Sequence, residues 1–216
     1  MLLEAALRFL FPDPAKCFLC GAPVALSPLC TACASSFRAG RSTMQPKIEF
    51  VNRVFALAPY RGEVRKKLHA LKYWDRPAFA RSFAQAVCDL VILTERYDLV
   101  TAIPMHRRRF IQRGYNQAEL LAREIAARQR TPFRQVLKRV QDTRPQHLLG
   151  RMARQENLAH ALALTARVEG LRVLLVDDIL TTGSTLSAAA SLLVTSKVKH
   201  VDALVVAVSL ADSAGQ

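Results

Sequence analysis

Two adjacent carboxylates and a run of hydroxyl side chains stand together in the C-terminal part of this 216-residue chain. Asp177 and Asp178 end an apolar segment, and the loop that follows contains Thr181, Thr182, Gly183, Ser184 and Thr185. Amide groups at the start of a helix attract anions, hydroxyls donate further hydrogen bonds, and glycine lets the backbone approach a phosphate. Carboxylates accept hydrogen bonds from sugar hydroxyls. The pattern therefore predicts a site for a phosphoribose.

A simpler interpretation is that this loop only caps a helix and that both aspartates are solvated. The paired acids at the end of a strand favour the ligand site, because open α/β sheets bind their ligands at that edge. Other phosphate-binding motifs are absent, since the chain has no G-x-x-x-x-G-K-[ST] and no G-x-G-x-x-G after a strand pattern. An ordinary nucleotide-binding fold is therefore disfavoured.

Four cysteines near the N-terminus form a second group with chemical potential. They occur as two C-x2-C pairs, Cys17 with Cys20 and Cys30 with Cys33. Such pairs supply the four thiolates of a tetrahedral Zn2+ site, which is closed to substrates and normally structural. Disulfides or a redox function are the alternatives. Disulfides are disfavoured because no export signal is recognisable, which predicts a reducing, cytoplasmic location.

Basic residues are concentrated in the middle of the chain. Lys and Arg total 31 against 17 Asp and Glu, which gives a net charge of +14, and the segment Ile103–Arg154 alone carries +10. Clustered charge favours a polyanionic partner, whereas evenly spread charge would favour only solubility. Arginines next to aromatic rings are typical of surfaces that bind single-stranded nucleic acid. The residues with this combination are Arg107, Arg108, Arg109, Phe110, Arg113 and Tyr115.

Apolar patterns around these groups predict the elements that position them. Strand patterns at Val54–Tyr60, Asp98–Pro104, Leu171–Asp178 and His200–Leu210 alternate with helical patterns at Gly62–Leu71, Pro77–Thr94, Asn116–Gln129 and Ser184–Val194. This alternation predicts an α/β domain with a parallel sheet flanked by helices. A polar connector near Arg41–Glu49 suggests an N-terminal helix and zinc module over residues 1–47 and the α/β domain over residues 48–216. No stretch reaches the roughly 18 apolar residues of a membrane span.

Together, these motifs resemble those of a known family. The stretch VLLVDDILTTGST is similar to the signature with which type I phosphoribosyltransferases bind 5-phosphoribosyl-1-pyrophosphate (PRPP). With the four-cysteine head and the stretches Tyr60–Tyr73 and Pro104–Ala122, the chain resembles the ComF family, which is associated with DNA uptake in natural transformation. The resemblance implies a type I phosphoribosyltransferase-like fold, PRPP as a ligand, and a competence helicase as a possible partner.

The resemblance also implies roles for single residues. Asp177 and Asp178 would contact the ribose hydroxyls, as provisional catalytic residues, and Thr181–Thr185 would hold the 5-phosphate. Mg2+ would bridge the ribose and the pyrophosphate, and a lid would lie at Thr143–Asn157. The loop expected to meet the pyrophosphate consists of Met105, His106 and Arg107, with Arg107 as the main contact.

Two functions stay open at this level. One is a phosphoribosyltransferase that passes phosphoribose from PRPP to an unidentified base or amine. The other, which we favour, is a DNA-handling protein that binds PRPP as a ligand and binds single-stranded DNA through its basic segment. Against a DNA site there, Phe110 and Tyr115 could be core residues while the arginines serve pyrophosphate alone.

Overall fold

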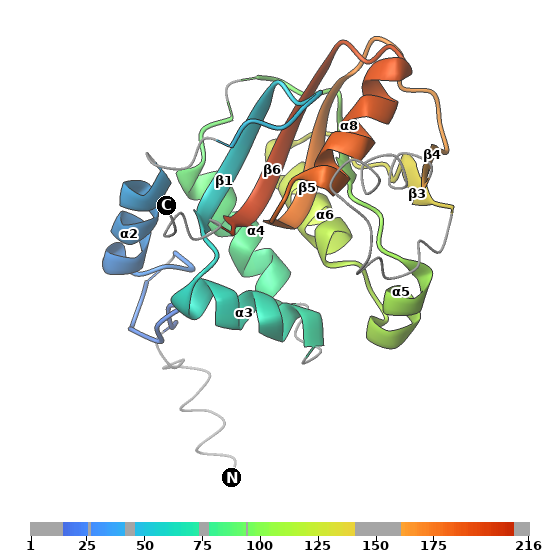
Figure 1. The fold of residues 1–216 in the computed structure, drawn as a ribbon. Helices are drawn as coiled ribbons and strands as arrows, with labels where there is room; N and C mark the ends of the chain where they lie inside the picture. Colours follow the sequence, from blue (N-terminus) through green and yellow to red (C-terminus); the bar gives the residue numbers. More distant parts are fainter. Residues whose placement is uncertain are drawn as a thin grey trace, which may run out of the picture.

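A parallel sheet forms the centre of the protein, as a computed structural model of residues 15–25, 27–41, 46–73, 78–93, 95–140 and 161–209 shows (Figure 1). Its strand order is β1-β6-β5-β2, and every neighbouring pair is parallel. The strands are β1 (Arg53–Pro59), β2 (Leu99–Ala102), β5 (Arg172–Leu180) and β6 (His200–Val208). The predicted α/β class with a parallel sheet is confirmed.

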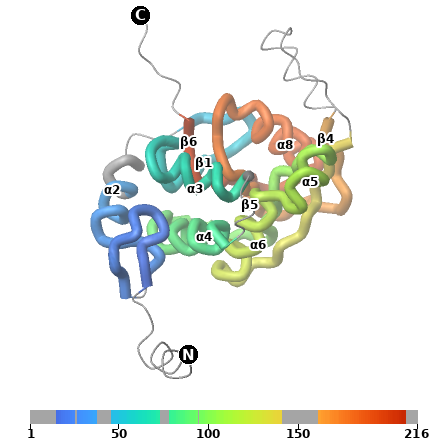
Figure 2. Tube along the Cα trace, turned by 90° about the horizontal axis from the view of Figure 1, so that it is seen from below, coloured from blue at the N-terminus to red at the C-terminus, as the bar shows by residue number. Residues whose placement is uncertain are grey.

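Helices cover both faces of this sheet (Figures 1 and 2). The helices expected from the apolar pattern are α3 (Gly62–Tyr73), α4 (Ala78–Leu90), α6 (Gln117–Gln129) and α8 (Ser184–Thr195). Two further helices, α2 (Thr31–Arg41) and α5 (Arg107–Arg113), were not expected from the sequence. Helix α5 has no buried residue, so no apolar pattern reveals it. Helix α2 begins inside the cysteine motif, which was interpreted only as a source of metal ligands.

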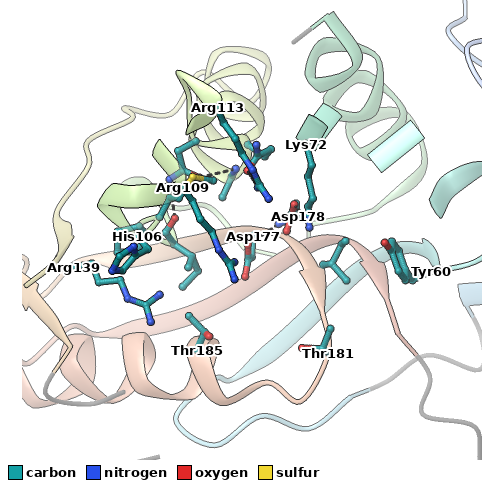
Figure 3. Close-up of a pocket in the computed structure, with 17 residues that line it drawn as sticks. Tyr60, Lys72, His106, Arg109, Arg113, Arg139, Asp177, Asp178, Thr181 and Thr185 are labelled. Carbon is teal, nitrogen blue, oxygen red and sulfur yellow. Dashed lines mark hydrogen bonds and ion pairs between the residues drawn. The ribbon is translucent and has the colours of Figure 1, made fainter. Parts of the chain in front are cut away.

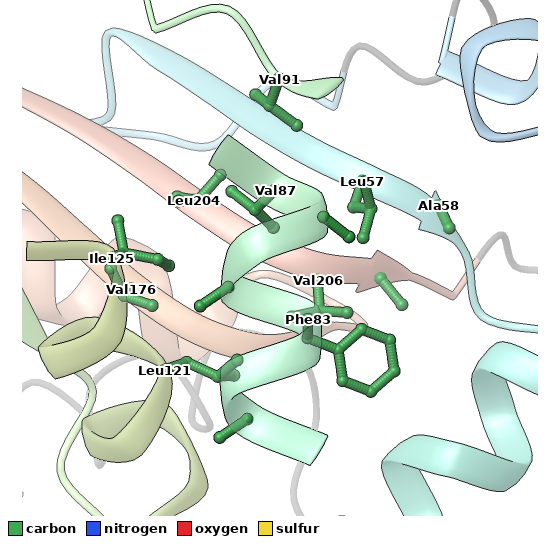
Figure 4. Close-up of a cluster of buried hydrophobic side chains, with 14 of the residues drawn as sticks. Leu57, Ala58, Phe83, Val87, Val91, Leu121, Ile125, Val176, Leu204 and Val206 are labelled. Carbon is green, nitrogen blue, oxygen red and sulfur yellow. The ribbon is translucent and has the colours of Figure 1, made fainter. Parts of the chain in front are cut away.

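Alternate residues of the central strands enter two separate hydrophobic cores. In β5, Leu174 and Val176 belong to the core beneath α4 and α6, while Val173 and Leu175 belong to the core beneath α8. A strand turns successive side chains to opposite faces, so a continuous apolar run is buried on both sides. Figure 4 shows the first core, where α4 contributes Phe83 and Val87, α6 contributes Leu121 and Ile125, and the strands contribute Leu57, Val176, Leu204 and Val206.

The N-terminal head shares the first of these cores. Leu19 and Phe37 are buried in it, and the ring of Phe18 meets Phe83 of α4 edge-to-face at 4.9 Å between centroids. The head is therefore packed against the sheet domain, with α2 beside β1 and α4. The division at residues 47 and 48 stays a prediction.

A short antiparallel pair lies beside the main sheet. It consists of β3 (Leu137–Arg139) and β4 (Leu162–Leu164). A parallel bridge from Val100 to Phe133 leads the chain from the sheet toward β3, so Arg139 comes near the carboxyl ends of the strands. The lid expected at Thr143–Asn157 lies outside the described residues.

Candidate functional site

A cavity of about 370 Å³ opens at the carboxyl edge of the sheet (Figure 3). One side is formed by the acid pair and the loop after β5, with Asp177, Asp178, Thr181 and Thr185. The other side is formed by basic and amide side chains from α3, α5, α6 and β3: Lys72, His106, Arg109, Arg113, Gln117 and Arg139. The structure thus brings the carboxylates and hydroxyls of the predicted phosphoribose site together with part of the basic segment.

The two aspartates have different surroundings. Asp178 is buried, and its Oδ2 lies 2.8 Å from the Nζ of Lys72, whose side chain is 21% exposed. Asp177 is half-buried, and its Oδ1 accepts a hydrogen bond from the backbone N–H of Asp178 at 2.8 Å. Burial and the adjacent charge of Asp178 raise the pKa of the Asp177 carboxyl, which Lys72 offsets only in part. The charge of Asp178 is therefore compensated by Lys72, whereas Asp177 resists ionisation.

Lys72 was not predicted as a site residue. It stands in the last turn of α3, far from Asp178 in sequence, and only its place in the family-like stretch Tyr60–Tyr73 pointed to it. Figure 3 shows its side chain reaching down to Asp178 from α3, while Arg109 points toward Asp177 from α5. Two cations from different helices thus approach the acid pair.

The hydroxyl loop forms a helix start whose N-cap residue has no side chain to cap it. Its N-cap is Gly183, with φ at 80°, and Ser184 begins α8. This backbone conformation favours glycine, and a Cβ at Gly183 would also require the end of the Ile48 side chain to move. Thr181 and Thr185 line the cavity, whereas the hydroxyls of Thr182 and Ser184 lie 3.0 Å from each other. Uncapped amides at the start of a helix form an anion site.

The loop after β2 forms the opposite wall of the cavity. Met105 and His106 line it, and His106 is the N-cap of α5, where its Nδ1 accepts from the N–H of Arg108 at 3.2 Å. In the neutral imidazole, this bond places the proton on Nε2, which becomes a donor. Arg107 is exposed and is not among the lining residues.

Helical rotation explains why Arg107 does not face the cavity. Residues four apart share one face of a helix, so Arg109 and Arg113 of α5 point the same way and both line the cavity. Arg107 lies two residues before Arg109 and therefore projects from another face. The choice of Arg107 as the pyrophosphate contact stays a prediction, and the cavity favours Arg109 and Arg113.

Two amides at the start of α6 complete this wall, and sequence reasoning missed both. Asn116 caps the helix by accepting from the N–H of Ala118, and it donates to the carbonyl of Ile103 at 2.9 Å. Gln117 is buried, and its Oε1 accepts from Arg113 at 3.1 Å. Within the described chain, the buried Nε2 of Gln117 has no acceptor. A buried donor of this kind costs about 1–3 kcal/mol unless a ligand oxygen satisfies it.

The four cysteines of the head form a separate cluster. The sulfur atoms of Cys17, Cys20, Cys30 and Cys33 all lie within 4.8 Å of one another, a set compatible with a zinc site. Burial opposes ionisation of Cys17, but backbone amides around it outweigh this and lower the pKa of its thiol to about 6. Burial and the neighbouring sulfurs raise the pKa of Cys33. Several thiolates can share this space only with a compensating cation.

Comparison with known proteins identifies relatives of the chain. The profile of the phosphoribosyl transferase domain matches residues 112–215. The DNA utilization protein YhgH of Salmonella typhi is 30% identical over 208 residues, which cover 83% of this chain and 91% of that protein. Competence protein F of Haemophilus influenzae is 36% identical over 129 residues, or 56% of each chain. The chain belongs to the ComF family.

The fold of this ComF-family chain agrees with the domain match. The parallel sheet and its flanking helices form a type I phosphoribosyltransferase fold, with the four-cysteine cluster at the N-terminus. The allosteric regulatory enzyme of purine biosynthesis superposes with a TM-score of 0.40 and 19% identity, over 61% of this chain and 25% of that one, so the chain spans about a quarter of that enzyme's length. None of the helices in the described ranges is long and apolar enough to cross a membrane.

The predicted DNA-binding residues divide into two sets in the ComF-family structure. No residue of α5 is buried, and Phe110 is 47% exposed. Tyr115 lies after α5, half-buried against the core, and its hydroxyl donates to the carbonyl of Leu71 at 2.6 Å. The ring of Phe110 is therefore exposed, whereas Tyr115 is held by its hydrogen bond and by the core. The placement of Tyr115 agrees with the alternative interpretation, in which it is a core residue. DNA binding by α5 stays a prediction.

Proposed function

We propose that this ComF-family chain handles single-stranded DNA during DNA uptake and binds PRPP with Mg2+ at the carboxyl edge of its sheet. The observation that carries the proposal is the cavity. On one side lie the start of α8 and the acid pair, Asp177 and Asp178. On the other side lies the basic wall, which consists of His106, Arg109, Arg113, Gln117 and Arg139. Relatives named DNA utilization protein and Competence protein F support the DNA part.

The cavity offers a matching group for each part of PRPP. The uncapped start of α8 with Thr181 and Thr185 suits the 5-phosphate, and Asp177 and Asp178 suit the ribose hydroxyls. The pyrophosphate would lie against the basic wall, where the donors are His106, Arg109, Arg113, Gln117 and Arg139. Guanidinium groups bind such oxygens in pairs of hydrogen bonds.

Magnesium fits the same arrangement. Mg2+ prefers oxygen ligands and binds through one or two carboxylates together with substrate phosphates. Asp177 lines the cavity between the two phosphate-binding sides, and the pKa of its carboxyl is raised by burial and by Asp178, so a cation there would favour its ionised form. Bound with PRPP, the ion would supply positive charge to the pyrophosphate.

The second candidate function is phosphoribosyl transfer at this same cavity. It is favoured because the two aspartates and the basic side chains face each other across one cavity, as the ribose and the pyrophosphate of a transfer reaction would require. In that reaction, an acceptor nitrogen forms a bond to the anomeric carbon while the bond to pyrophosphate breaks, and the acceptor proton leaves to a base or water. The chain's residues would hold the ribose and the leaving group, and the basic wall would stabilise the charge that pyrophosphate gains.

A thermal-shift experiment and a release experiment test these functions. PRPP with Mg2+ should raise the melting temperature by mass action, whereas ribose 5-phosphate should raise it less because it leaves the basic wall unoccupied. Equal shifts would mean that the basic wall does not bind pyrophosphate. Pyrophosphate release that depends on an added base or amine would establish the transferase, and its absence alongside PRPP binding would favour a ligand role.

We also propose that the four-cysteine cluster holds one structural Zn2+. The thiolates converge as a closed tetrahedral set requires, and the cluster lies against the core and away from the cavity. Cytoplasmic location follows as part of this proposal, because reduced thiols persist there. A helicase of the uptake machinery is a proposed partner on the family resemblance alone.

A further inference from the structure

A second hollow lies outside the cavity, on the exposed side of α3. It has a volume of about 560 Å³ and is lined mainly by α3, with one aromatic ring from the first turn of α4. The lining residues that matter are Arg65, Lys66, Lys67, His69, Ala70 and Phe79. We call this hollow the α3 groove. The proposed PRPP site uses none of these residues.

The α3 groove combines positive charge with an apolar surface. Lys66 pairs with Glu63 at 2.7 Å, and the Nζ of Lys67 lies 5.2 Å from the centre of the Phe79 ring. Arg65 is exposed, and its guanidinium has no ion-pair or hydrogen-bond partner among the residues that the structure describes. An anionic ligand could therefore bind the guanidinium of Arg65 in the groove that also contains the Phe79 ring, which already contacts a cation.

The groove lies at the same end of the molecule as α5. In Figure 1 both helices lie at the lower edge, and in Figure 2, seen from that side, they lie on either side of the end of β5. The cavity opens at this end, between them. A strand of nucleic acid that touches both helices would therefore pass the mouth of the cavity.

We infer that the α3 groove is a second contact site for the single-stranded DNA whose first contact is α5, an inference that rests on the proposed DNA-binding function. Single strands bind where basic side chains follow the phosphates and rings stack on the bases. Arg65 and Lys66 suit the phosphates, and Phe79 suits a base once Lys67 turns to a phosphate. An acidic peptide would use the same charges but not the ring, so the groove favours nucleic acid.

Fluorescence anisotropy on the full-length protein tests the inference. The change is Arg65→Glu, and the matched control is Lys199→Glu, an exposed lysine just before β6 at the opposite edge of the sheet. For an oligonucleotide of about 16 nucleotides, we expect Arg65→Glu to bind several-fold more weakly than the control and with a smaller salt dependence. For one of about 4 nucleotides, which α5 alone can hold, the two variants should agree.

A second variant tests the ring. Phe79→Leu keeps an apolar side chain against the core and should weaken the longer oligonucleotide without changing the PRPP thermal shift. Equal affinities for Arg65→Glu and Lys199→Glu would overturn the inference while leaving DNA binding at α5 intact. No binding by the wild type at low salt would overturn the proposed DNA function and the groove with it. Binding of polyglutamate that depends on Arg65, in place of DNA, would assign the groove to acidic proteins.

Discussion

The cysteine head and the sheet-edge cavity gather reactive groups in opposite ways. In the head, four sulfurs lie within 4.8 Å of one another, so the groups converge on one point and leave no room for a substrate between them. At the sheet edge, the acid pair and the basic wall stand on either side of about 370 Å³ of space. Groups that converge on a point suit a structural ion, and groups that face across a space suit a ligand.

The two regions also differ in how their charges are compensated. In the head, no lysine or arginine contributes to the lowered pKa of Cys17, which backbone amides cause. At the edge, Lys72 compensates Asp178, but the Nε2 of Gln117 has no acceptor within the described chain. Unmet hydrogen-bonding capacity in a cavity wall is where a ligand gains affinity. Removing a zinc ion from the head should therefore lower the stability of the protein, whereas substitutions in the cavity should weaken ligand binding.

Metal removal should have the largest effect on the molecule. We expect about one zinc per chain, and chelation should unfold the head, because structural zinc contributes on the order of 10 kcal/mol to such modules. The contact between Phe18 and Phe83 ties the head to the core, so the melting temperature of the whole protein should fall. Metal analysis with thermal denaturation, before and after chelation, checks this.

Cys88→Ser is the control for metal loss. Cys88 lies on α4, outside the cluster, and the variant should keep its zinc. Well under half an equivalent of zinc in a folded wild-type protein, with four freely titrating thiols in the head, would contradict the structural role.

The acid pair should decide PRPP binding. Asp177→Asn with Asp178→Asn should abolish the thermal shift produced by PRPP and Mg2+, a shift that corresponds to about 2.7 kcal/mol at 100 times the Kd. Asp89→Asn with Glu169→Gln replaces two carboxyl groups at exposed positions outside the cavity and should keep the shift. A shift that survives in the first variant would mean that the loop is only a helix cap.

Local and distant parts of this site differed in how far sequence could predict them. The cysteine pairs and the loop Thr181–Thr185 are contiguous motifs, so their spacing alone predicts a class of ligand for each. Lys72, Gln117 and Arg139 reach the cavity from three other elements, and only the packing of those elements brings them to Asp177 and Asp178. No local sequence pattern specifies that side chains from different elements will line one cavity.

The same distinction holds for the fold. Strands β5 and β6 each contain a continuous apolar run, and this pattern predicted them. Helix α5 has no buried residue, so it leaves no apolar period in the sequence. Without that helix, its rotation was unknown, so the sequence could not indicate that Arg109 lines the cavity and Arg107 does not.

The pH dependence of stability should reveal the raised pKa of the Asp177 carboxyl. The folded-state pKa of Asp177 is raised by burial and by Asp178, so the folded protein binds this proton more tightly than the unfolded chain. Its contribution is fully present below the unfolded pKa and is lost as the pH rises through the folded pKa. Asp177→Asn removes this loss, so its melting temperature should exceed that of wild type at about pH 9 and not at about pH 4. A constant difference across this range would contradict the raised pKa.

The smallest expected effect concerns DNA at α5. Arg107 and Arg108 are exposed and do not line the cavity, so Arg107→Ala with Arg108→Ala should weaken single-stranded DNA binding while the PRPP shift persists. Arg109 is left in place because it lines the cavity. Each lost phosphate contact should reduce the log–log salt slope by about 0.7, and affinity should fall by a few-fold per arginine with little dependence on base sequence.

Anisotropy across a salt series separates this outcome from a simple loss of charge. The control is Arg167→Ala with Lys199→Ala, two exposed basic residues that flank the starts of β5 and β6, at the other edge of the sheet. Both double variants lower the net charge equally, so a general attraction would weaken equally in both. If α5 is the contact, only its own variant should flatten the slope, and Phe110→Leu should weaken binding at every salt concentration because stacking is not screened. Equal slopes in the two double variants would remove α5 from the DNA site and leave the arginines of its inner face to the cavity alone.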